Sequence, residues 1–192
     1  MTLGSALLGC SVIWWGTDGF RAITAETARR LHVSENPRLI SQYQLQTMAG
    51  DWKSLKINEP TLIEFIYTTC ASICQTSGGD FAELRDHLAK RGLTVPMISI
   101  SFDPETDDVN ALRQYAEIHG ASGDPWTVAR PVPANLKDLL NDFDVLVIRD
   151  DWGGYEHNVA VLMINSEGRF SRAFDTRDFE QISEAVKTDL GI

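Results

Sequence analysis

Two of the three cysteines, Cys70 and Cys74, lie four positions apart in the chain, whereas Cys10 stands alone in an apolar N-terminal stretch. At the start of a helix, a spacing of four places both sulfurs on one face, about one turn apart. There they could hold one metal ion together or form a local disulfide. Backbone N–H groups and the positive end of the helix dipole lower a thiol pKa at such a position, which favours the thiolate that both reactions require. The pair therefore predicts a metal site or a redox-active dithiol, with a purely structural disulfide as the remaining alternative.

A third donor for a metal ion would most often be a histidine. Two thiolates are soft ligands that suit Cu(I), and neutral imidazole is the commonest additional ligand. Of the four histidines, His32 lies in a polar N-terminal region, and His87 and His119 fall beside charged residues on predicted helices, where solvated side chains are expected. His157 differs because it follows a Gly-Gly pair and precedes a buried strand, whose end can face the Cys70 loop. His157 is the candidate third ligand, and an ordinary loop histidine is the alternative.

The segment around the cysteines predicts a buried strand followed by a helix. Residues 61–67 form a nearly continuous apolar run, as expected for a strand covered on both faces, and this run leads towards Cys70. Residues 72–91 carry apolar side chains at spacings of three and four, which is typical of an amphipathic helix. The cysteines are therefore expected at a strand-to-helix junction.

Strand and helix patterns alternate along the rest of the chain. Strands are predicted at residues 95–102, 126–130, 145–148, 159–164 and 169–174, with a weak edge strand at 43–47. Helices are predicted after Thr106 as a capping residue, over 133–143 and from 176 onwards, while 150–158 is predicted to be a loop. This order is that of a thioredoxin-like α/β domain, with a central mixed sheet flanked by helices.

The composition predicts one globular domain with no nucleic-acid partner. The 192 residues include 17 Lys and Arg against 27 Asp and Glu, which gives a formal net charge of −10. A hydrophobic fraction of 43% with 23% charged residues is sufficient for a core, and the length suits a single domain. Binding to phosphates requires clustered Lys and Arg, whereas the basic residues here are scattered. DNA and RNA are therefore excluded as expected partners.

The N-terminal region predicts attachment to a membrane. Residues 1–17 contain no charged side chain and include a tryptophan pair, as in a short membrane anchor. The stretch Leu7-Leu8-Gly9-Cys10 also resembles a lipobox, which would make Cys10 a lipidation site, and an apolar soluble tail is the third possibility. Residues 18–41 are mostly polar and are predicted to be a tether, so the folded domain is expected over residues 42–192.

Three sequence blocks resemble the Sco/SenC family of copper-binding assembly factors. They are FIYTTCASIC at 65–74, SISFDPETD at 99–107 and YEHN at 155–158. The blocks follow the order and spacing of the family, and the resemblance covers about residues 42–190. It implies that Cys70, Cys74 and His157 are ligands of copper, as Cu(I) and/or Cu(II). It also implies that Asp103 supports the site without binding the ion.

The resemblance further implies delivery of copper to the CuA subunit of cytochrome c oxidase or to a related copper enzyme. The protein would then be held at a bacterial inner membrane by its N-terminus, with the domain facing the periplasm. The alternative is a thiol-disulfide oxidoreductase, in which Cys70 and Cys74 reduce the cysteines of the copper-site target and depend on a thiol reductant partner. A peroxiredoxin-like peroxidase would need an activating arginine that the sequence does not place. Ala71 and Gln75 replace prolines found in many family members, which is expected to loosen the loop.

Overall fold

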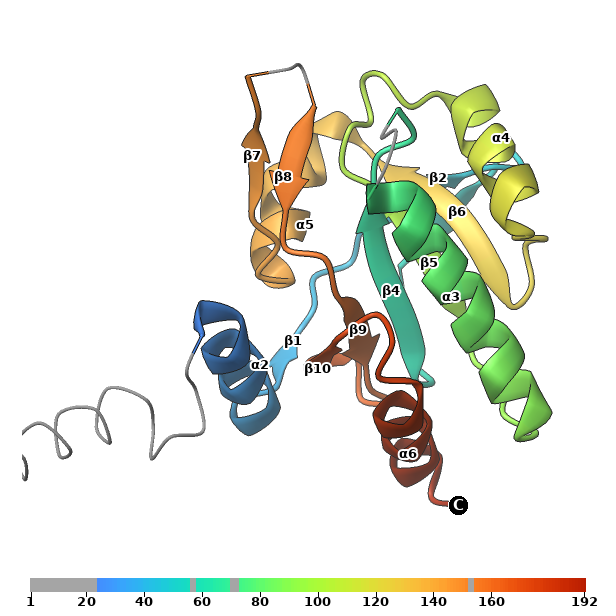
Figure 1. The fold of residues 1–192 in the computed structure, drawn as a ribbon. Coiled ribbons are helices and arrows are strands. Elements are labelled where there is room, and N and C mark those ends of the chain that lie inside the picture. The colour runs from blue at the N-terminus through green and yellow to red at the C-terminus, as the bar shows by residue number, and fades with distance from the viewer. Residues whose placement is uncertain (1–23, 56–57, 70–72, 152–153) are drawn as a thin grey trace, which may run out of the picture.

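The computed structural model describes residues 24–55, 58–69, 73–151 and 154–192, with residues 73–75 described by their backbone alone. The described residues form an eight-stranded mixed sheet at the centre of the molecule (Figure 1). From one edge to the other, the strands are β1 (Arg38–Leu39), β10 (Arg169–Phe174), β9 (Val161–Ile164), β4 (Thr61–Ile66), β5 (Met97–Ser101), β6 (Trp126–Pro131), β2 (Gln44–Thr47) and β3 (Trp52–Ser54). Strands β4, β5 and β6 are parallel, and the other neighbours in the sheet pair antiparallel.

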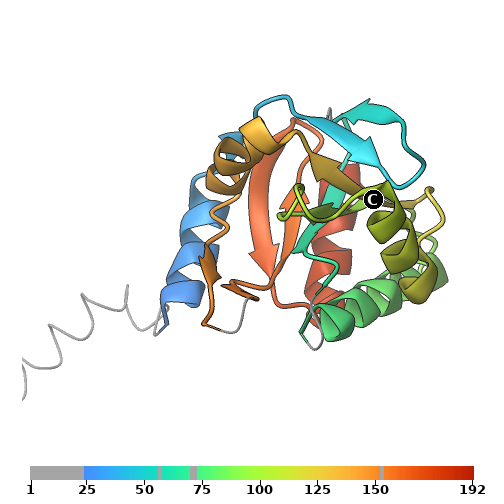
Figure 2. The ribbon, with the colours of Figure 1, turned by 90° about the horizontal axis from the view of Figure 1, so that it is seen from above.

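Helices cover both faces of this sheet (Figure 2). One face packs against α3 (Ile73–Lys90), α4 (Val109–His119) and α6 (Phe179–Leu190), and the other packs against α2 (Ala25–Glu35) and α5 (Leu136–Asp142), the last preceded by a 3₁₀ turn at Pro133–Asn135. All six residues of β4 are buried, because this strand lies inside the sheet and between two helical layers. The predicted central strand and mixed sheet flanked by helices are confirmed.

A second, two-stranded sheet stands beside the main one. It pairs β7 (Val147–Arg149) with β8 (Tyr155–His157) in antiparallel register, with Val147 opposite His157. The sequence predicted a loop for residues 150–158, so the placement of His157 in that loop was wrong. The strand was missed because it is only three residues long and follows a Gly-Gly pair, which favours a loop, although its partner β7 is close in sequence.

Helix α4 begins two residues later than predicted. Its N-terminal cap is Asp108, whose Oδ1 accepts hydrogen bonds from the backbone N–H groups of Asn110 and Ala111, both at 2.9 Å. Thr106, the predicted cap, instead donates its backbone N–H to the carbonyl of Asp103 in the preceding turn. Gly120 closes the helix in the left-handed conformation, with φ 75°, which favours glycine.

Residues 24–41 pack onto the sheet, which differs from the tether predicted for residues 18–41. Thr24 caps α2 by accepting a hydrogen bond from Thr27 N, and Val33 is buried in the core with 1% exposure. Strand β1 pairs with β10 and so extends the sheet. The predicted anchor at residues 1–17, including Cys10, lies outside the described residues. Within the described part of the chain, no helix is both long enough and apolar enough to cross a membrane.

Candidate metal and redox site

The cysteine pair is located where a buried strand gives way to a helix. Strand β4 ends at Ile66, and Cys74 is the second residue of α3. Cys70 and the side chain of Cys74 lie outside the described residues, so the predicted ligation by these two residues is not tested by the structure. The segment that leads to Cys70 is described as far as Thr69, and its contacts are informative.

The approach to Cys70 is fixed by a fully buried carboxylate, that of Asp107. Its Oδ2 accepts the backbone N–H of Thr68 at 3.0 Å and the hydroxyl of Ser101 at 2.6 Å, while its Oδ1 accepts the Thr68 hydroxyl at 2.5 Å. Arg130 in turn donates to the backbone carbonyls of Pro104 and Asp107 at 2.9 and 3.0 Å. The chain two residues before Cys70 is therefore tied to β5 and to the turn that follows it.

Asp103, the acid singled out from the sequence, has a different environment. Its backbone N–H donates to Ser101 Oγ at 3.0 Å, and its carbonyl accepts from Thr106 and Asp107. Among the described residues, its carboxylate makes no hydrogen bond or ion pair, and the side chain is half-buried. Sequence reasoning therefore missed Asp107, although the residue closes the SISFDPETD block. The signal in the sequence was its position: Asp107 directly precedes Asp108, the cap of α4, so its carboxylate neither caps the helix nor lies on the exposed helix face.

His157 is a half-buried histidine whose ring lies against an aromatic side chain. Its ring packs edge-on against Phe102, with centroids 4.9 Å apart. Both ring nitrogens are buried, and neither has a hydrogen-bond partner in the described part of the chain. Burial lowers the pKa of His157 to about 4, which keeps the imidazole neutral at neutral pH. A neutral ring with an unused nitrogen lone pair is the form in which histidine binds a metal ion.

An aromatic cluster joins the histidine strand to the cysteine loop. The cluster consists of Tyr67, Phe102, Tyr155 and His157. The Tyr67 ring lies 5.2 Å from both Phe102 and Tyr155, and Tyr155 N–H donates to the Tyr67 hydroxyl at 3.4 Å. A Cβ atom at position 154 would lie 3.2 Å from that hydroxyl, so Gly154 permits the close approach. Tyr67 is three residues before Cys70, so the cluster links His157 to the segment that leads to the first cysteine. Figure 1 shows β8 at the same end of the main sheet as the start of α3.

The other histidines do not join this group. His87 packs against Phe179 at 5.5 Å and His119 against Tyr115 at 4.4 Å, so both are half-buried rather than solvated as predicted. Among the described residues, no group of three or more His, Cys, Asp or Glu side chains is placed to hold a metal ion. The aromatic cluster links His157 to Tyr67, in the segment that leads to Cys70, and Cys70 itself lies outside the described residues.

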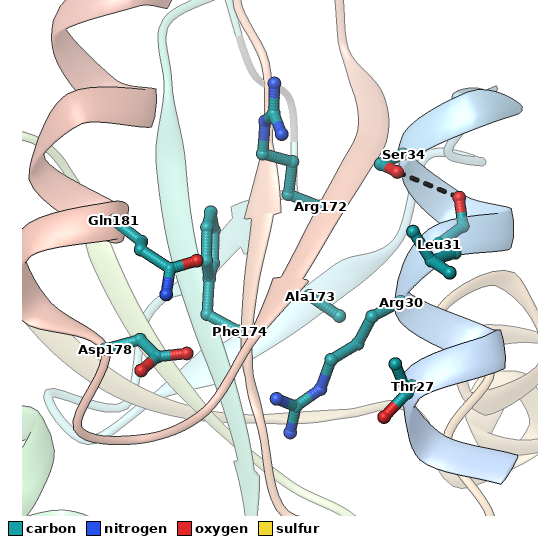
Figure 3. Close-up of a pocket in the computed structure, with 9 residues that line it drawn as sticks. All are labelled: Thr27, Arg30, Leu31, Ser34, Arg172, Ala173, Phe174, Asp178 and Gln181. Carbon is teal, nitrogen blue, oxygen red and sulfur yellow. Dashed lines mark hydrogen bonds between the residues drawn. The ribbon is translucent and has the colours of Figure 1, made fainter. Parts of the chain in front are cut away.

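A separate groove of about 210 Å³ lies between α2, β10 and the start of α6 (Figure 3). Its wall includes Arg30, Leu31, Phe174 and Gln181. Arg30 is already engaged by Glu26 at 2.9 Å and by Asp175 at 3.4 Å. None of the lining residues comes from the β4–α3 junction or from the β7–β8 hairpin, so the groove is distinct from the cysteine site.

The fold and the junction define a thioredoxin-like α/β domain with a cysteine pair at the start of a helix and a histidine on an added hairpin. The model of the SCO1/SenC family matches residues 32–190, and the chain belongs to that family. The SCO1 protein homolog of Bacillus subtilis (strain 168) is 35% identical over 74 residues, which are 38% of this chain and 38% of that protein. The chain spans between 38% and 57% of the length of the curated relatives that it matches.

Solved structures show the same fold. The ScoI protein of Bradyrhizobium japonicum, solved with copper bound, matches with a TM-score of 0.65 at 23% identity, covering 79% of this chain and 99% of that one. BsSco, described with a disulfide switch and as a member of the Sco family of cytochrome c oxidase assembly proteins, matches with a TM-score of 0.71 at 22% identity, covering 80% and 94%. The thioredoxin-like fold predicted from the sequence is confirmed.

Proposed function

We propose that this protein is a copper metallochaperone that carries copper on Cys70, Cys74 and His157 and delivers it to the CuA centre of cytochrome c oxidase or to a related copper enzyme. Family membership supports the general role, since a structural relative holds copper and another belongs to the cytochrome c oxidase assembly proteins. The resemblance implies the three ligand residues, and the chemistry of this chain supports their assignment.

The single observation that carries the assignment is the state of His157. A buried polar atom without a partner costs free energy, and the two ring nitrogens of His157 have none among the described residues. Burial keeps this ring neutral, and the aromatic cluster holds it near the segment that leads to Cys70. A metal ion bound by the two thiolates would also bind one of these nitrogens. This would explain why the ring has no hydrogen-bond partner among the described residues.

The surrounding residues act by positioning. Asp107 fixes Thr68 and thereby the path of the chain into Cys70. The Phe102 ring packs against His157, and its contacts with Tyr67 and Tyr155 tie that position to the segment that leads to Cys70. We assign Asp103, at the end of β5, to the support of the site, since its carboxylate is not committed to another group of the described chain.

Copper is the cargo in this proposal, and the ligand set suits its transfer. Two thiolates and one imidazole favour Cu(I) with three ligands. A ligand of the target protein can then bind the ion before one of the three original ligands dissociates. In this proposal the ion is held at the start of α3, and the N-terminal segment would act as an anchor in a bacterial inner membrane with the domain facing the periplasm.

The test is a titration of the reduced protein with Cu(I) against a competing chelator. We expect 1:1 binding that is abolished by Cys70→Ser or Cys74→Ser and weakened by His157→Ala. His119→Ala is the matched control, because it removes another half-buried histidine from outside the cluster. A protein that only reduces disulfides would show reductase activity with Cu(I) affinity independent of His157, and that result would overturn the assignment.

A further inference from the structure

Glu64 is a buried carboxyl group in the central strand that no step of the proposed function uses. It is 2% exposed and lies on the side of β4 that faces α3 and α4. Ser99 Oγ lies 2.6 Å from Glu64 Oε1, Ser77 Oγ lies 2.9 Å from Oε2, and the Tyr115 hydroxyl lies 3.4 Å from Oε1. Three hydroxyl groups from β5, α3 and α4 therefore converge on one carboxyl group.

The directions of these hydrogen bonds decide where a proton would be held. Trp126 Nε1 donates to Ser99 Oγ at 2.8 Å, so the single hydroxyl proton of Ser99 is left for Glu64 Oε1. The Ser77 hydroxyl can reverse, because a hydroxyl group both donates and accepts. A proton added to Glu64 therefore sits on Oε2 and is donated to Ser77, a residue of α3.

The charges on α3 favour a protonated Glu64. Asp80 lies one turn from Ser77 and is 6% exposed, and its carboxylate is paired with Arg177 at 2.6 Å and accepts from Thr176 at 2.8 Å. Burial, with Asp80 adding to its effect, raises the pKa of Glu64 to about 7, although the three hydroxyl groups oppose the rise. Glu64 thus changes charge near neutral pH.

The α4 side of Glu64 supplies no permanent charge. Tyr115 and His119 face it from that helix, and burial lowers the pKa of His119, which keeps this ring neutral. A Cβ atom at Gly78 would collide with the Tyr115 hydroxyl, so glycine is what lets α3 and α4 approach here. Arg85 of α3 lies over the Trp126 ring at 5.7 Å.

We propose that Glu64 is a proton-binding group coupled to the cysteine pair, which takes up a proton through its contact with Ser77 when Cys70 and Cys74 become thiolates. The coupling rests on the proposed role of these cysteines and on the chain path. Ser77 follows Cys74 by three residues in α3, about 4.5 Å along the helix axis at 1.5 Å per residue. Glu64 stands in the strand that leads to Cys70, six residues before it.

The coupling follows from charge balance. When two thiols bind Cu(I), they lose two protons and leave a site with a net charge of −1. A second negative charge on Glu64, in an interior of low dielectric constant, would oppose this. Uptake of one of the two protons by Glu64 Oε2 removes the repulsion, and the other proton goes to solvent. No electron is transferred, and the same logic applies when thiolates form in the metal-free dithiol.

The experiment compares wild type with Glu64→Gln. Glutamine keeps the shape, accepts from Ser99 and donates to Ser77, but cannot ionise. At pH 5.5, where Glu64 is already protonated, the two proteins should bind Cu(I) within twofold of each other. At pH 8.5 Glu64→Gln should bind about tenfold more tightly, which corresponds to one pKa unit of coupling. Calorimetry near pH 8 in buffers of different ionisation enthalpy should show that Cu(I) binding releases fewer protons from wild type than from Glu64→Gln.

Glu83→Gln is the matched control, since it makes the same change at an exposed site on the same helix and should match wild type throughout. A carbon-13 NMR titration of wild type supplies a readout that needs neither a variant nor copper. The signal absent from Glu64→Gln should titrate near neutrality, at higher pH in the dithiol than in the disulfide form. The inference would be overturned if the Glu64 signal titrated at the same pH in the dithiol and disulfide forms. It would also be overturned if wild type and Glu64→Gln bound Cu(I) with equal affinity and released equal numbers of protons. If the wild-type protein failed to bind Cu(I), the proposed function would fail, and the NMR comparison would still decide the role of Glu64.

Discussion

The carboxylate of Asp107 accepts hydrogen bonds from both the backbone N–H and the hydroxyl of Thr68, across 39 positions of sequence. This double contact fixes the chain just before Cys70. It joins the FIYTTCASIC and SISFDPETD blocks, which are adjacent in the fold because β4 and β5 are parallel neighbours.

Replacing Asp107 should therefore damage both the fold and the site. In Asp107→Ala the Thr68 N–H and the Ser101 hydroxyl lose a buried acceptor, so the free energy of unfolding should fall by about 2–3 kcal/mol. The Cu(I) affinity should fall by about tenfold or more, as for other residues that orient metal ligands. Urea denaturation and chelator competition measure the two effects.

Asp103→Asn is the informative partner of that variant. Because the Asp103 carboxylate has no hydrogen bond within the described residues, its loss should leave stability unchanged. If Asp103 supports the copper site, affinity or the rate of transfer should still fall by about tenfold. Unchanged copper binding and transfer would remove Asp103 from the site.

The stability of the fold should decrease in mild acid because of His157. Its pKa is about 4 in the folded protein against an ordinary value of 6.5, so the unfolded chain takes up a proton first as the pH falls. The contribution is complete above pH 6.5 and is lost towards pH 4. His157→Phe, which keeps a ring against Phe102 but cannot be protonated, should gain about 2 kcal/mol relative to wild type between pH 7 and pH 5, at 1.36 kcal/mol per pKa unit. Parallel pH profiles for the two proteins would contradict this account.

Copper loading and disulfide formation should exclude one another. Oxidation of Cys70 and Cys74 to a disulfide consumes both proposed sulfur ligands, and metal binding requires thiolates. Chelator competition should show no 1:1 Cu(I) binding to the oxidised protein and full binding after reduction and removal of the reductant. Equal affinity in both states would place the copper site elsewhere.

Helix α2 and strand β1 should be needed for full stability. A chain that starts at residue 24 retains both, whereas one that starts at residue 42 exposes the core around Val33 and leaves β10 as an unpaired edge. The shorter chain should lose at least about 2 kcal/mol of unfolding free energy, the value of burying one valine side chain. Chemical denaturation of the two truncated proteins tests this, and equal midpoints would restore the tether interpretation.

The central strand and the helix after it could be predicted because their signals are local. Residues 61–66 form a continuous apolar run, and the buried face of α3 repeats every three or four residues. The cap of α4 could not be assigned in the same way. Thr106, Asp107 and Asp108 are all suitable capping residues, and the choice of Asp108 depends on Asp107 being occupied by the distant Thr68.

The surroundings of His157 could not be predicted either, because they also depend on residues that are distant in sequence. Its strand has three residues, and its environment is made by Phe102 and Tyr67, which come from two other segments. Helix α2 buries only Val33, and one buried residue is too little for a pattern to reveal. Glu64 was hidden inside an apolar run, where a single acid has no periodic signature.

The β7–β8 hairpin belongs to a different sheet from the strand that leads to the cysteines, and within the described residues no backbone ladder connects the two. The proposed ligands thus come from segments attached to two separate sheets. Tilted and edge-on ring contacts join these sheets, through Tyr67, Phe102, Tyr155 and His157. Side-chain contacts of this kind can shift without breaking backbone hydrogen bonds, whereas two paired strands cannot separate without breaking them. If copper is bound as proposed, a shift of the hairpin would move His157 relative to the cysteines without breaking a backbone hydrogen bond of the main sheet, and release of the ion would not require the eight-stranded core to unfold.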